Sequence, residues 1–545
     1  MDERLIQELP KKSKVALTDY TLIEDEDGTK LAQVSSFKQI LTSNLMFNTI
    51  EDLKSATLKE GEICMTLGYH EINDGGGATY YIAYEPTAVE DNGLVHYLYT
   101  SDTLRAKLVV YDYITPEQFG AYGDGTHDDS AIINKCIDTG YMVKFNAGHI
   151  YRINTPIQLK SDMYLDFDGA KIKPTYCDMF SKKADVSDLN PIVNITIKGF
   201  YADLSKASNG FNIAHPVRNM DVSDFVMYGI TSYGFKLPAC DQVHIHDGHM
   251  IGGDLQTQVG IGLVNQLSDT LKTMYPSAYI VIDNIRFENF YPAISMNILD
   301  IPVTSAIKHC SNVGDATSVY SLFVSVYGSP NFMTVTDCMI VNTAGTIKVN
   351  SIGSTINVGN IHTVNGNSKR TEISPMATAF SSGFFFIDAS SPSTIINLDG
   401  NYTISNGSMM PTSVAKVPIM SKLFGTLIIK GAFALPIDTC FIDSYSPSQY
   451  PGTVMDFHEP KSYPLEIYTS TEIPNDTILN RYVDAQASQI TNIQPGVNGQ
   501  RMYLISSTGG TVVRGNNINI VENSVVLSKT SGIELKYDGS KWTQI

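Results

Sequence analysis

The chain lacks the features that mark several common functional classes. Its seven cysteines are dispersed and none forms a C-x-x-C pair, so no zinc ribbon or thiol redox motif is visible. No uninterrupted apolar run approaches the roughly 20 residues of a membrane span, and the first ten residues have no apolar segment typical of a signal peptide. We therefore expect reduced, buried thiols and a protein made in a cytoplasm and not exported by the usual route.

Positive charge is also scarce. The chain has 38 basic and 56 acidic residues, a net charge of −18, which argues against a nucleic-acid or membrane partner. The apolar share of 43% and the charged share of 17% are typical of a folded protein. A chain of 545 residues is too long to fold around one ordinary globular core, which indicates several domains or an extended repeat.

Glycine and aspartate are concentrated in one segment, residues 118–133, with the sequence QFGAYGDGTHDDSAII. Gly120, Gly123 and Gly125 permit backbone angles that residues with a Cβ avoid. Asp128 or Asp129 can accept a hydrogen bond from the first turn of the helix that the following apolar spacing predicts. Brief β segments follow, so we expect a glycine-rich turn, a short helix and then short strands.

This order resembles the start of the right-handed parallel β-helix of bacteriophage tailspikes and pectate-lyase-like proteins. Their pattern F-G-A-x-G-D-G-x-x-D-D is matched from Phe119 to Asp129. Single glycines and aspartates are common in turns, but the whole ordered string before a helix and strands is specific. The resemblance implies an all-β chain built on a right-handed parallel β-helix, with small N-terminal modules and a C-terminal β-sandwich-like module.

An irregular repeat of short strands around a polar or glycine corner supports a solenoid. Two pairs of corners lie 23 residues apart, whereas other spacings are 37 and 53 residues. The corners considered are Asp224, Asp247, Asn284, Asp337 and Asn360. The longer spacings predict insertions, and we expect the segments Asp254–Tyr279 and Leu299–Ser318 to be specificity loops.

Changes in the pattern of strands and turns along the chain predict four domains. Residues 1–45 include two strand-like segments around Asp27-Gly28 and resemble the modules that attach phage fibres to the virion. Residues 46–113 form a small β-rich head or neck domain, and residues 114–470 form the β-helix. Residues 471–545 form a C-terminal β module for trimerisation or glycan binding, in which Trp542 is expected to be structural rather than a sugar platform.

The densest polar cluster is the segment Asp241–His249, followed by Asp254. In a strand, His244 and His246 share one face. Two neutral imidazoles and an aspartate could hold a divalent cation or supply a base and an acid. Alternatively, Asp247-Gly248 is only a corner and the histidines stack or face solvent. The spacing requires no metal, and no cofactor follows firmly from the sequence.

Carboxylates offer a second route to chemistry, because glycosidic cleavage uses two of them. Glu288 lies away from the corners and among aromatic residues, where a raised pKa would suit an acid. Tyrosines in the same region are suited to sugar stacking, and Arg286 is one of few basic residues there. The catalytic candidates are Asp247, Asp254, Glu288, Asp241 and His246. The substrate-binding candidates are Tyr201, Tyr228, Tyr233, Arg286 and Tyr291.

The resemblance implies a phage tail spike or appendage, a homotrimer in the virion tail whose residues 1–45 contact other tail proteins. Its ligand is then a host surface glycopolymer. Lysine exceeds arginine and isoleucine and asparagine are frequent, which hints at an AT-rich genome and at teichoic acid or capsule. The function is a glycosidase, phosphodiesterase or lyase that degrades the polymer, or a non-catalytic receptor-binding fibre on the same scaffold. A free-living polysaccharide lyase is disfavoured.

Overall fold

The structure is a computed structural model. It describes residues 20–25, 28–33, 45–182, 190–238, 240–253, 258–264, 269–275, 277–290, 292–298, 302–313, 322–328, 331–341, 345–351, 355–365, strands between 387 and 456, 465–470, 472–474, 480–496, 498–515, 517–528 and 531–545. The chain divides into two compact units, Met1–Gly123 with Lys135–Asn146, and Asp124–Asn134 with Ala147–Ile545.

The first unit contains a hairpin and a five-stranded sheet of order β3-β4-β5-β7-β6. In the hairpin, Asp25 lies opposite Gly28, so the strands are joined by a tight turn as Asp27-Gly28 predicted, and Gly28 is also the first residue of the second strand. The bounds are β1 Tyr20–Asp25, β2 Gly28–Gln33, β3 Met46–Phe47, α3 Ile50–Ser55, β4 Ile63–Thr66, β5 Thr79–Tyr84, β6 Val95–Leu98, β7 Ser101–Leu108, η1 Pro116–Phe119 and β9 Val143–Lys144.

The glycines of residues 118–133 have the left-handed backbone that the sequence predicts, but Asp124–Asp128 forms the strand β8 and not only a turn before the helix. Gly120, Gly123 and Gly125 have φ angles of 94°, 58° and 77°, all in the left-handed region. Asp128 accepts a hydrogen bond from the Ser130 N–H at 3.1 Å, where helix α4 (Ser130–Asp138) begins. The Ser130 hydroxyl accepts one from the Asn154 N–H at 2.8 Å. The first turn of the helix is therefore bound to the first strands behind it.

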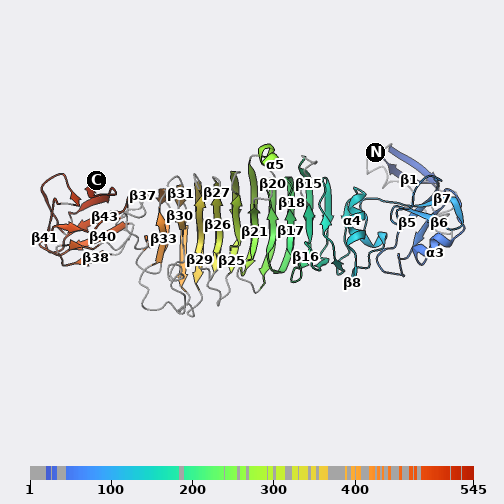
Figure 1. The fold of residues 1–545 in the computed structure, drawn as a ribbon, viewed down its shortest axis with the longest axis horizontal. Coiled ribbons are helices and arrows are strands. Elements are labelled where there is room, and N and C mark those ends of the chain that lie inside the picture. Colours follow the sequence, from blue (N-terminus) through green and yellow to red (C-terminus); the bar gives the residue numbers. More distant parts are fainter. Residues whose placement is uncertain are drawn as a thin grey trace. The chain divides into compact units, whose positions relative to one another are not determined.

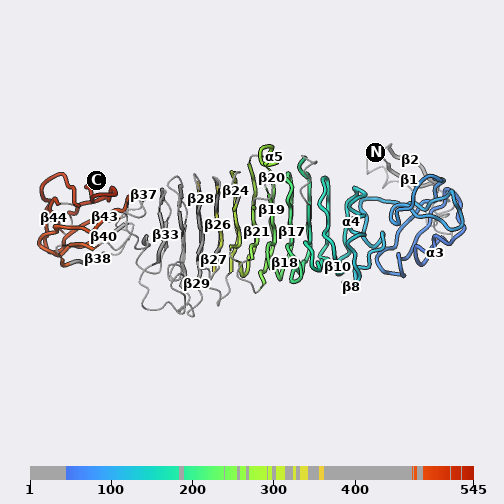
Figure 2. The backbone as a smooth tube through the Cα atoms, in the orientation of Figure 1, coloured from blue at the N-terminus to red at the C-terminus, as the bar shows by residue number. Residues whose placement is uncertain are grey.

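The second unit is dominated by two parallel sheets that run side by side, as a parallel β-helix requires (Figure 1). Successive coils of the chain add strands to both sheets, and the backbone can be followed from coil to coil in Figure 2. The first sheet contains β8 Asp124–Asp128, β10 Ile150–Ile153, β12 Met163–Asp166, β13 Lys171–Pro174, β15 Ile192–Lys198, β16 Tyr201–Asp203, β18 Val217–Ile230, β20 Cys240–Gly252, β22 Ala278–Glu288, β24 Val303–Lys308, β25 Ser311–Val313, β27 Asn331–Val341, β29 Thr355–Asn365, β31 Ile395–Leu398, β32 Asn401–Asn406, β34 Thr426–Ile429, β35 Ala432–Ala434 and β37 Thr453–Asp456. The second contains β11 Ile157–Gln158, β14 Phe180–Lys182, β17 Asn209–Ile213, β19 Tyr233–Leu237, β21 Val259–Val264, β23 Ile294–Ile298, β26 Leu322–Gly328, β28 Gly345–Ser351, β30 Ile387–Ala389, β33 Val417–Leu423 and β36 Cys440–Ile442.

The space between the two sheets is filled by side chains that stack from coil to coil. Phe211 stacks on Phe180 and on Phe235, with ring centroids 4.6 and 4.4 Å apart. Phe200 and Phe225, from the other sheet, stack at 5.4 Å. All five rings are buried, and so are the six cysteines whose surroundings are described. Burial of these apolar surfaces, at roughly 25 cal/mol per Å², is what holds successive coils together.

The polar corners share one backbone conformation. Asp224, Asp247, Asn284, Asp337 and Asn360 all have φ between 50° and 55°. Aspartate and asparagine tolerate this left-handed conformation better than other residues with a Cβ. The corner side chains also bond along the stack, since the Asn284 amide donates to Asp247 Oδ1 at 2.5 Å and the Asn360 amide to Asp337 Oδ1 at 2.9 Å. The predicted corners are therefore correct.

The predicted insertions are wrong in part. His309, at φ 50°, is a further corner between Asn284 and Asp337, so the spacing of 53 residues is two coils rather than one. The segment Leu299–Ser318 accordingly contains β24 and β25. The segment Asp254–Tyr279 contains β21 and the helix α5 (Asp269–Met274). The missed corner at His309 explains β24 and β25, which belong to the first sheet. The spacing of 37 residues from Asp247 to Asn284 is one coil, because β20 pairs directly with β22, and it contains the helix α5 as additional chain, so the insertion predicted there is present.

The C-terminal residues form small sheets around their own core. The bounds are β38 Leu465–Tyr468, β39 Glu472–Ile473, β40 Asn480–Ala485, β41 Gln489–Ile490, β42 Asn492–Ile493, β43 Arg501–Ile505, β44 Thr511–Val513, β45 Ile518–Asn519, β46 Ser524–Val526, β47 Ile533–Tyr537 and β48 Trp542–Gln544. Trp542 is fully buried in this core and donates its indole N–H to the Gln494 carbonyl at 2.9 Å. It is therefore structural, as expected. Among the described residues, no helix has the length and apolar character needed to cross a membrane.

Candidate functional site

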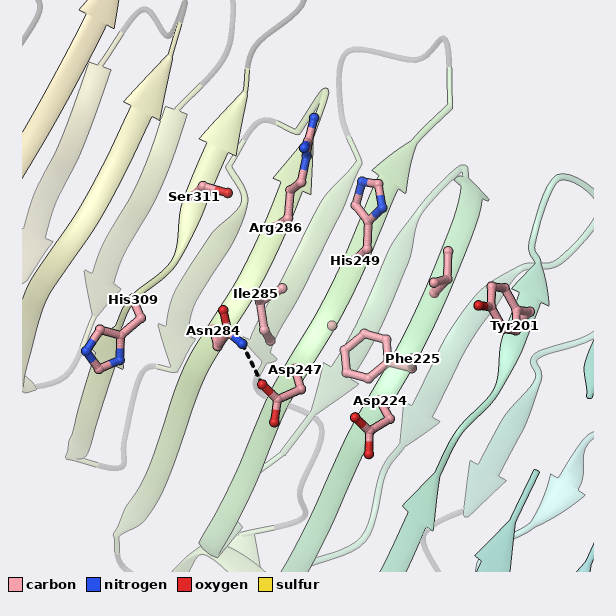
Figure 3. A pocket seen from close by; sticks show the side chains of 12 residues that line it. Tyr201, Asp224, Phe225, Asp247, His249, Asn284, Ile285, Arg286, His309 and Ser311 are labelled. Carbon is pink, nitrogen blue, oxygen red and sulfur yellow. Dashed lines mark hydrogen bonds between the residues drawn. The ribbon is translucent and has the colours of Figure 1, made fainter. Parts of the chain in front are cut away.

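An open groove of about 400 Å³ lies on the outer face of the first sheet, across β16, β18, β20, β22 and β25 (Figure 3). One side is formed by the corner residues Asp224, Asp247, Asn284 and His309. The other side is formed by the outward residues Tyr201, Val226, His249, Arg286 and Ser311.

Strand register explains why these residues meet. Tyr201 pairs with Val226, Val226 with His249, His249 with Arg286, and Arg286 with Ser311. Each of the last four lies two positions after a corner. Because the corners stack, the residues two positions later form a straight row on the outer face. The row and the column of corners together make the two sides of the groove.

The floor of the groove depends on a residue without a side chain. Gly248 follows the corner at Asp247 and faces inward. A Cβ at Gly248 would lie 2.2 Å from the ring of Phe225, which is buried and stacked on Phe200. Phe225 cannot move away in so dense a core. Glycine at this position therefore lets the aromatic stack pass beneath the groove.

A carboxylate, an imidazole and a guanidinium make contact beside the outward row, where Glu288 lies next to the groove but does not belong to its lining. Glu288 Oε1 lies 3.0 Å from His249 Nε2 and 2.6 Å from Arg286 Nε. His249 and Arg286 line the groove from neighbouring strands (Figure 3). The aromatic surroundings expected for Glu288 are not found among the described residues, because Phe287 and Phe290 are buried on the core side. Its neighbours are instead polar and charged.

A second polar cluster lies on the far side of the corners, outside the groove. His244 and His246 stack with ring centroids 4.0 Å apart, so the predicted shared face is correct. Asp221 Oδ2 lies 3.6 Å from His244 Nδ1 and 3.3 Å from His246 Nε2. His246 Nδ1 in turn lies 2.7 Å from Asp247 Oδ2.

Charge sets the protonation of this cluster. Burial opposes protonation of His246, but its hydrogen bond to Asp247 and the charge of Asp221 prevail and raise its pKa above the ordinary value. Burial and the neighbouring His246 lower the pKa of His244. Hydrogen bonds from His246 and Asn284 lower the pKa of Asp247. Asp247 is therefore a charged acceptor at neutral pH, and this corner does not supply a protonated acid.

Other sequence candidates lie elsewhere. Asp241 forms an exposed ion pair with Arg218 at 3.1 Å, six residues before Asp247 and outside the groove lining. Tyr233 belongs to β19 of the second sheet and so cannot line this groove. Tyr228 is exposed on β18 beside Asp203 but does not belong to the lining. Asp254 and Tyr291 lie outside the described residues.

Sequence reasoning named Asp247, Arg286 and Tyr201, and all three line the groove. It did not propose His249 as a site residue, nor Asp221 as a partner of the histidines. A signal for His249 was available, because counting two positions past each corner selects the outward row. The same counting gives Asp221, because Asp221 and His244 each lie three positions before a corner and are therefore paired between β18 and β20.

Comparisons with protein-family models and with curated proteins give no match. Many solved structures with similar folds are phage tailspikes, in agreement with the resemblance seen in the sequence. ORF18 of Geobacillus virus E2 is 13% identical, with 71% of this chain and 74% of that chain covered and a TM-score of 0.45. The gp42 tailspike of an Acinetobacter phage is 12% identical, with 92% and 93% covered and a TM-score of 0.46. The tailspike gp49 of Acinetobacter baumannii bacteriophage Fri1, a capsular polysaccharide depolymerase, is 14% identical, with 75% and 78% covered and a TM-score of 0.39. At sequence identities and TM-scores this low, neither the substrate nor the role of any residue can be transferred from these proteins to the present chain.

Proposed function

We propose that this chain is a phage tail spike or appendage that binds a host surface glycopolymer in the groove and cleaves it there. The observation that carries the proposal is the contact of Glu288 with His249 and Arg286 at the edge of an open groove. The motif from Phe119 to Asp129 at the start of the β-helix supports the phage assignment.

In this proposal His249 transfers the proton. Glu288 accepts the Nε2–H of His249 at 3.0 Å, which fixes the ring and leaves the Nδ1 lone pair for the substrate. Nδ1 takes a proton from the attacking water or sugar hydroxyl and returns it to the leaving oxygen. Glu288 is then a positioning residue. The catalytic residue in this proposal is His249, and not Glu288 as the sequence predicted.

Arg286 favours a polymer that carries negative charge. Its side chain is more than half exposed and lines the groove next to His249. A guanidinium donates to phosphate or carboxylate oxygens with matching geometry. The chain as a whole has a net charge of −18, so an exposed arginine in the groove provides a local positive charge that the rest of the protein does not. We therefore favour a teichoic acid or an acidic capsule as the polymer, and a phosphodiester or glycosidic bond as the target.

Tyr201 offers a platform for a sugar ring at the end of the lining that β16 forms. It is 44% exposed and stands in the outward row (Figure 3). An aromatic face packs against the C–H side of a sugar, and the hydroxyl adds a hydrogen bond. The distance from Tyr201 to Arg286 spans three strand spacings, about 14 Å, which is suited to more than one sugar unit.

The other modules complete the assignment. Residues 1–45 would attach the chain to other tail proteins, residues 46–113 would form the head or neck, and residues 471–545 would close a homotrimer in the virion tail. Attachment can be tested with a truncated phage protein that lacks residues 1–45 and retains the β-helix. The truncated protein should bind the polymer and fail to join the tail.

A non-catalytic receptor-binding fibre is the second candidate. It is favoured by Asp224 and Asp247, whose left-handed backbone alone accounts for their residue type. Incubation of the protein with purified cell-wall polymer separates the two, with fragments followed by size and mass spectrometry. New reducing ends, unsaturated sugars or free phosphates would identify the reaction, whereas tight binding without fragments would favour the fibre.

A further inference from the structure

The cluster of Asp221, His244 and His246 has a geometry that the polymer groove does not explain. These residues lie on β18 and β20, with Asp221 directly opposite His244 in the register. All three side chains are partly buried, and one ligand atom from each can be chosen so that the three atoms lie within 4.8 Å of one another. They do not belong to the groove lining.

The number of protons in the cluster does not match the number of acceptors. Asp247 Oδ2 and Asp221 Oδ2 lie on opposite sides of the His246 ring, at 2.7 Å from Nδ1 and 3.3 Å from Nε2. A neutral imidazole has one N–H, so one carboxylate must face a lone pair unless a second proton or a cation lies between them.

A second proton on the histidines would not satisfy His244. Its Nδ1 is 3.6 Å from the same Asp221 oxygen, which is beyond a good hydrogen bond. Its Nε2 is buried and has no hydrogen-bond partner among the described residues. The ring lies 4.0 Å from that of His246, so two protonated rings would repel each other. A single cation held by His244 Nδ1, His246 Nε2 and Asp221 would give each of the three atoms that face one another a partner without a second proton, and would leave the N–H of His244 on Nε2.

We propose that Asp221, His244 and His246 form a binding site for a divalent transition-metal ion of the Zn²⁺ class. Metal–ligand distances of about 2.1 Å in a tetrahedral site place neighbouring ligand atoms about 3.4 Å apart. The two distances from Asp221 Oδ2, 3.3 and 3.6 Å, agree with that spacing. Two imidazoles and a carboxylate are ligands suited to Zn²⁺ and its neighbours rather than to Ca²⁺ or Mg²⁺.

Asp247 has a defined part in this site. By accepting the Nδ1–H of His246, it fixes the tautomer in which Nε2 faces Asp221. Asp247 also lines the groove and bonds to Asn284. The metal would thereby fix one side of the groove through His246. Three protein ligands leave a fourth position for water or for an oxygen of a bound molecule.

The test is direct metal binding by the full chain, which does not depend on polymer cleavage. Chelator-treated protein is titrated with Zn²⁺ in a calorimeter, and bound zinc is counted after dialysis. One Zn²⁺ per chain is expected, with affinity lowered at least about tenfold in His244→Gln and in His246→Gln, and about tenfold in Asp247→Asn. Circular dichroism of each variant without metal checks that the fold is retained.

The matched control is His309→Asn. His309 is an exposed histidine two coils beyond the cluster, bonded to Asp283 at 2.8 Å, and asparagine suits its left-handed backbone. Its substitution should leave zinc affinity unchanged. The proposal also predicts that Co²⁺ gives the visible absorption of a tetrahedral ion in the wild type and not in His246→Gln. Absence of zinc binding, or equal binding by the His244→Gln and His246→Gln double variant, would overturn it.

Discussion

Asp247 has two possible reasons to be an aspartate, and substitutions can separate them. Its φ of 52° is a left-handed conformation that costs most residues with a Cβ roughly 1–2 kcal/mol. Its carboxylate also accepts hydrogen bonds from the Asn284 amide at 2.5 Å and from His246 Nδ1 at 2.7 Å. A hydrogen bond contributes about 0.5–1.5 kcal/mol, and the lower end applies because the side chain is 47% exposed.

These magnitudes predict an order of stability. Asp247→Ala combines backbone strain with the loss of two hydrogen bonds and should lower the free energy of unfolding by about 2–3 kcal/mol. Asp247→Gly avoids the strain, loses the bonds and adds chain entropy, about 1–2 kcal/mol. Asp247→Asn keeps a tolerated backbone and an acceptor oxygen, so it should cost less than about 1 kcal/mol.

Urea unfolding followed by circular dichroism measures the order. Asp241→Ala is the control, because Asp241 lies on the same strand, is not among the positive-φ residues, and forms only an exposed ion pair with Arg218. It should change stability by no more than about 1 kcal/mol. Equal losses for the alanine and asparagine variants of Asp247 would refute the backbone explanation, and so would an alanine variant as stable as the wild type.

Three further outcomes are expected. Gly248→Ala should lower the free energy of unfolding by at least about 2 kcal/mol in the same urea assay, because the new Cβ would lie 2.2 Å from the Phe225 ring; a neutral effect would contradict the packing described. Burial lowers the pKa of His96 to about 4 from 6.5, so the unfolded state takes up the proton first and the N-terminal unit should lose about 3 kcal/mol as pH falls from 6.5 to 4. Urea midpoints across that pH range should show the loss in the wild type and much less of it in His96→Phe. Tyr201→Ala should weaken binding of polymer fragments about threefold to tenfold by calorimetry, whereas Tyr228→Ala should not; the reverse order would place the sugar outside the groove.

The sequence predicts a structural feature well where a local backbone conformation requires one residue type. The left-handed glycines of the opening motif and the corners at Asp224 and Asp337 are examples, because few residues accept that backbone. His309 was not predicted to be a corner, because histidine is a less frequent residue there than aspartate or asparagine. The number of coils between Asn284 and Asp337, and the insertion inferred from that spacing, were wrong as a consequence.

Contacts between coils depend on register, so they follow from the sequence only where the corners on both coils are identified and residues are counted from them. Asp221 lies opposite His244 because the coil between them has the same 23 residues as the spacing of the corners Asp224 and Asp247, a consequence that the sequence analysis did not draw. Glu288 was expected among aromatics because Phe287 adjoins it in sequence, yet adjacent strand residues point to opposite faces. Its actual neighbours, His249 and Arg286, come from that alternation together with strand pairing.

The central claim is that His249, held by Glu288, cleaves polymer bound in the groove. The most direct measurement is the rate of fragment release from purified cell-wall polymer by the wild type, His249→Gln, Glu288→Gln and the control Arg218→Gln, with polymer binding measured in parallel. We predict a loss of about 10²-fold or more for His249→Gln, a smaller loss for Glu288→Gln, retained binding in both, and an unchanged control. Fragment release by His249→Gln at the wild-type rate, or no release by the wild-type protein, would contradict the account.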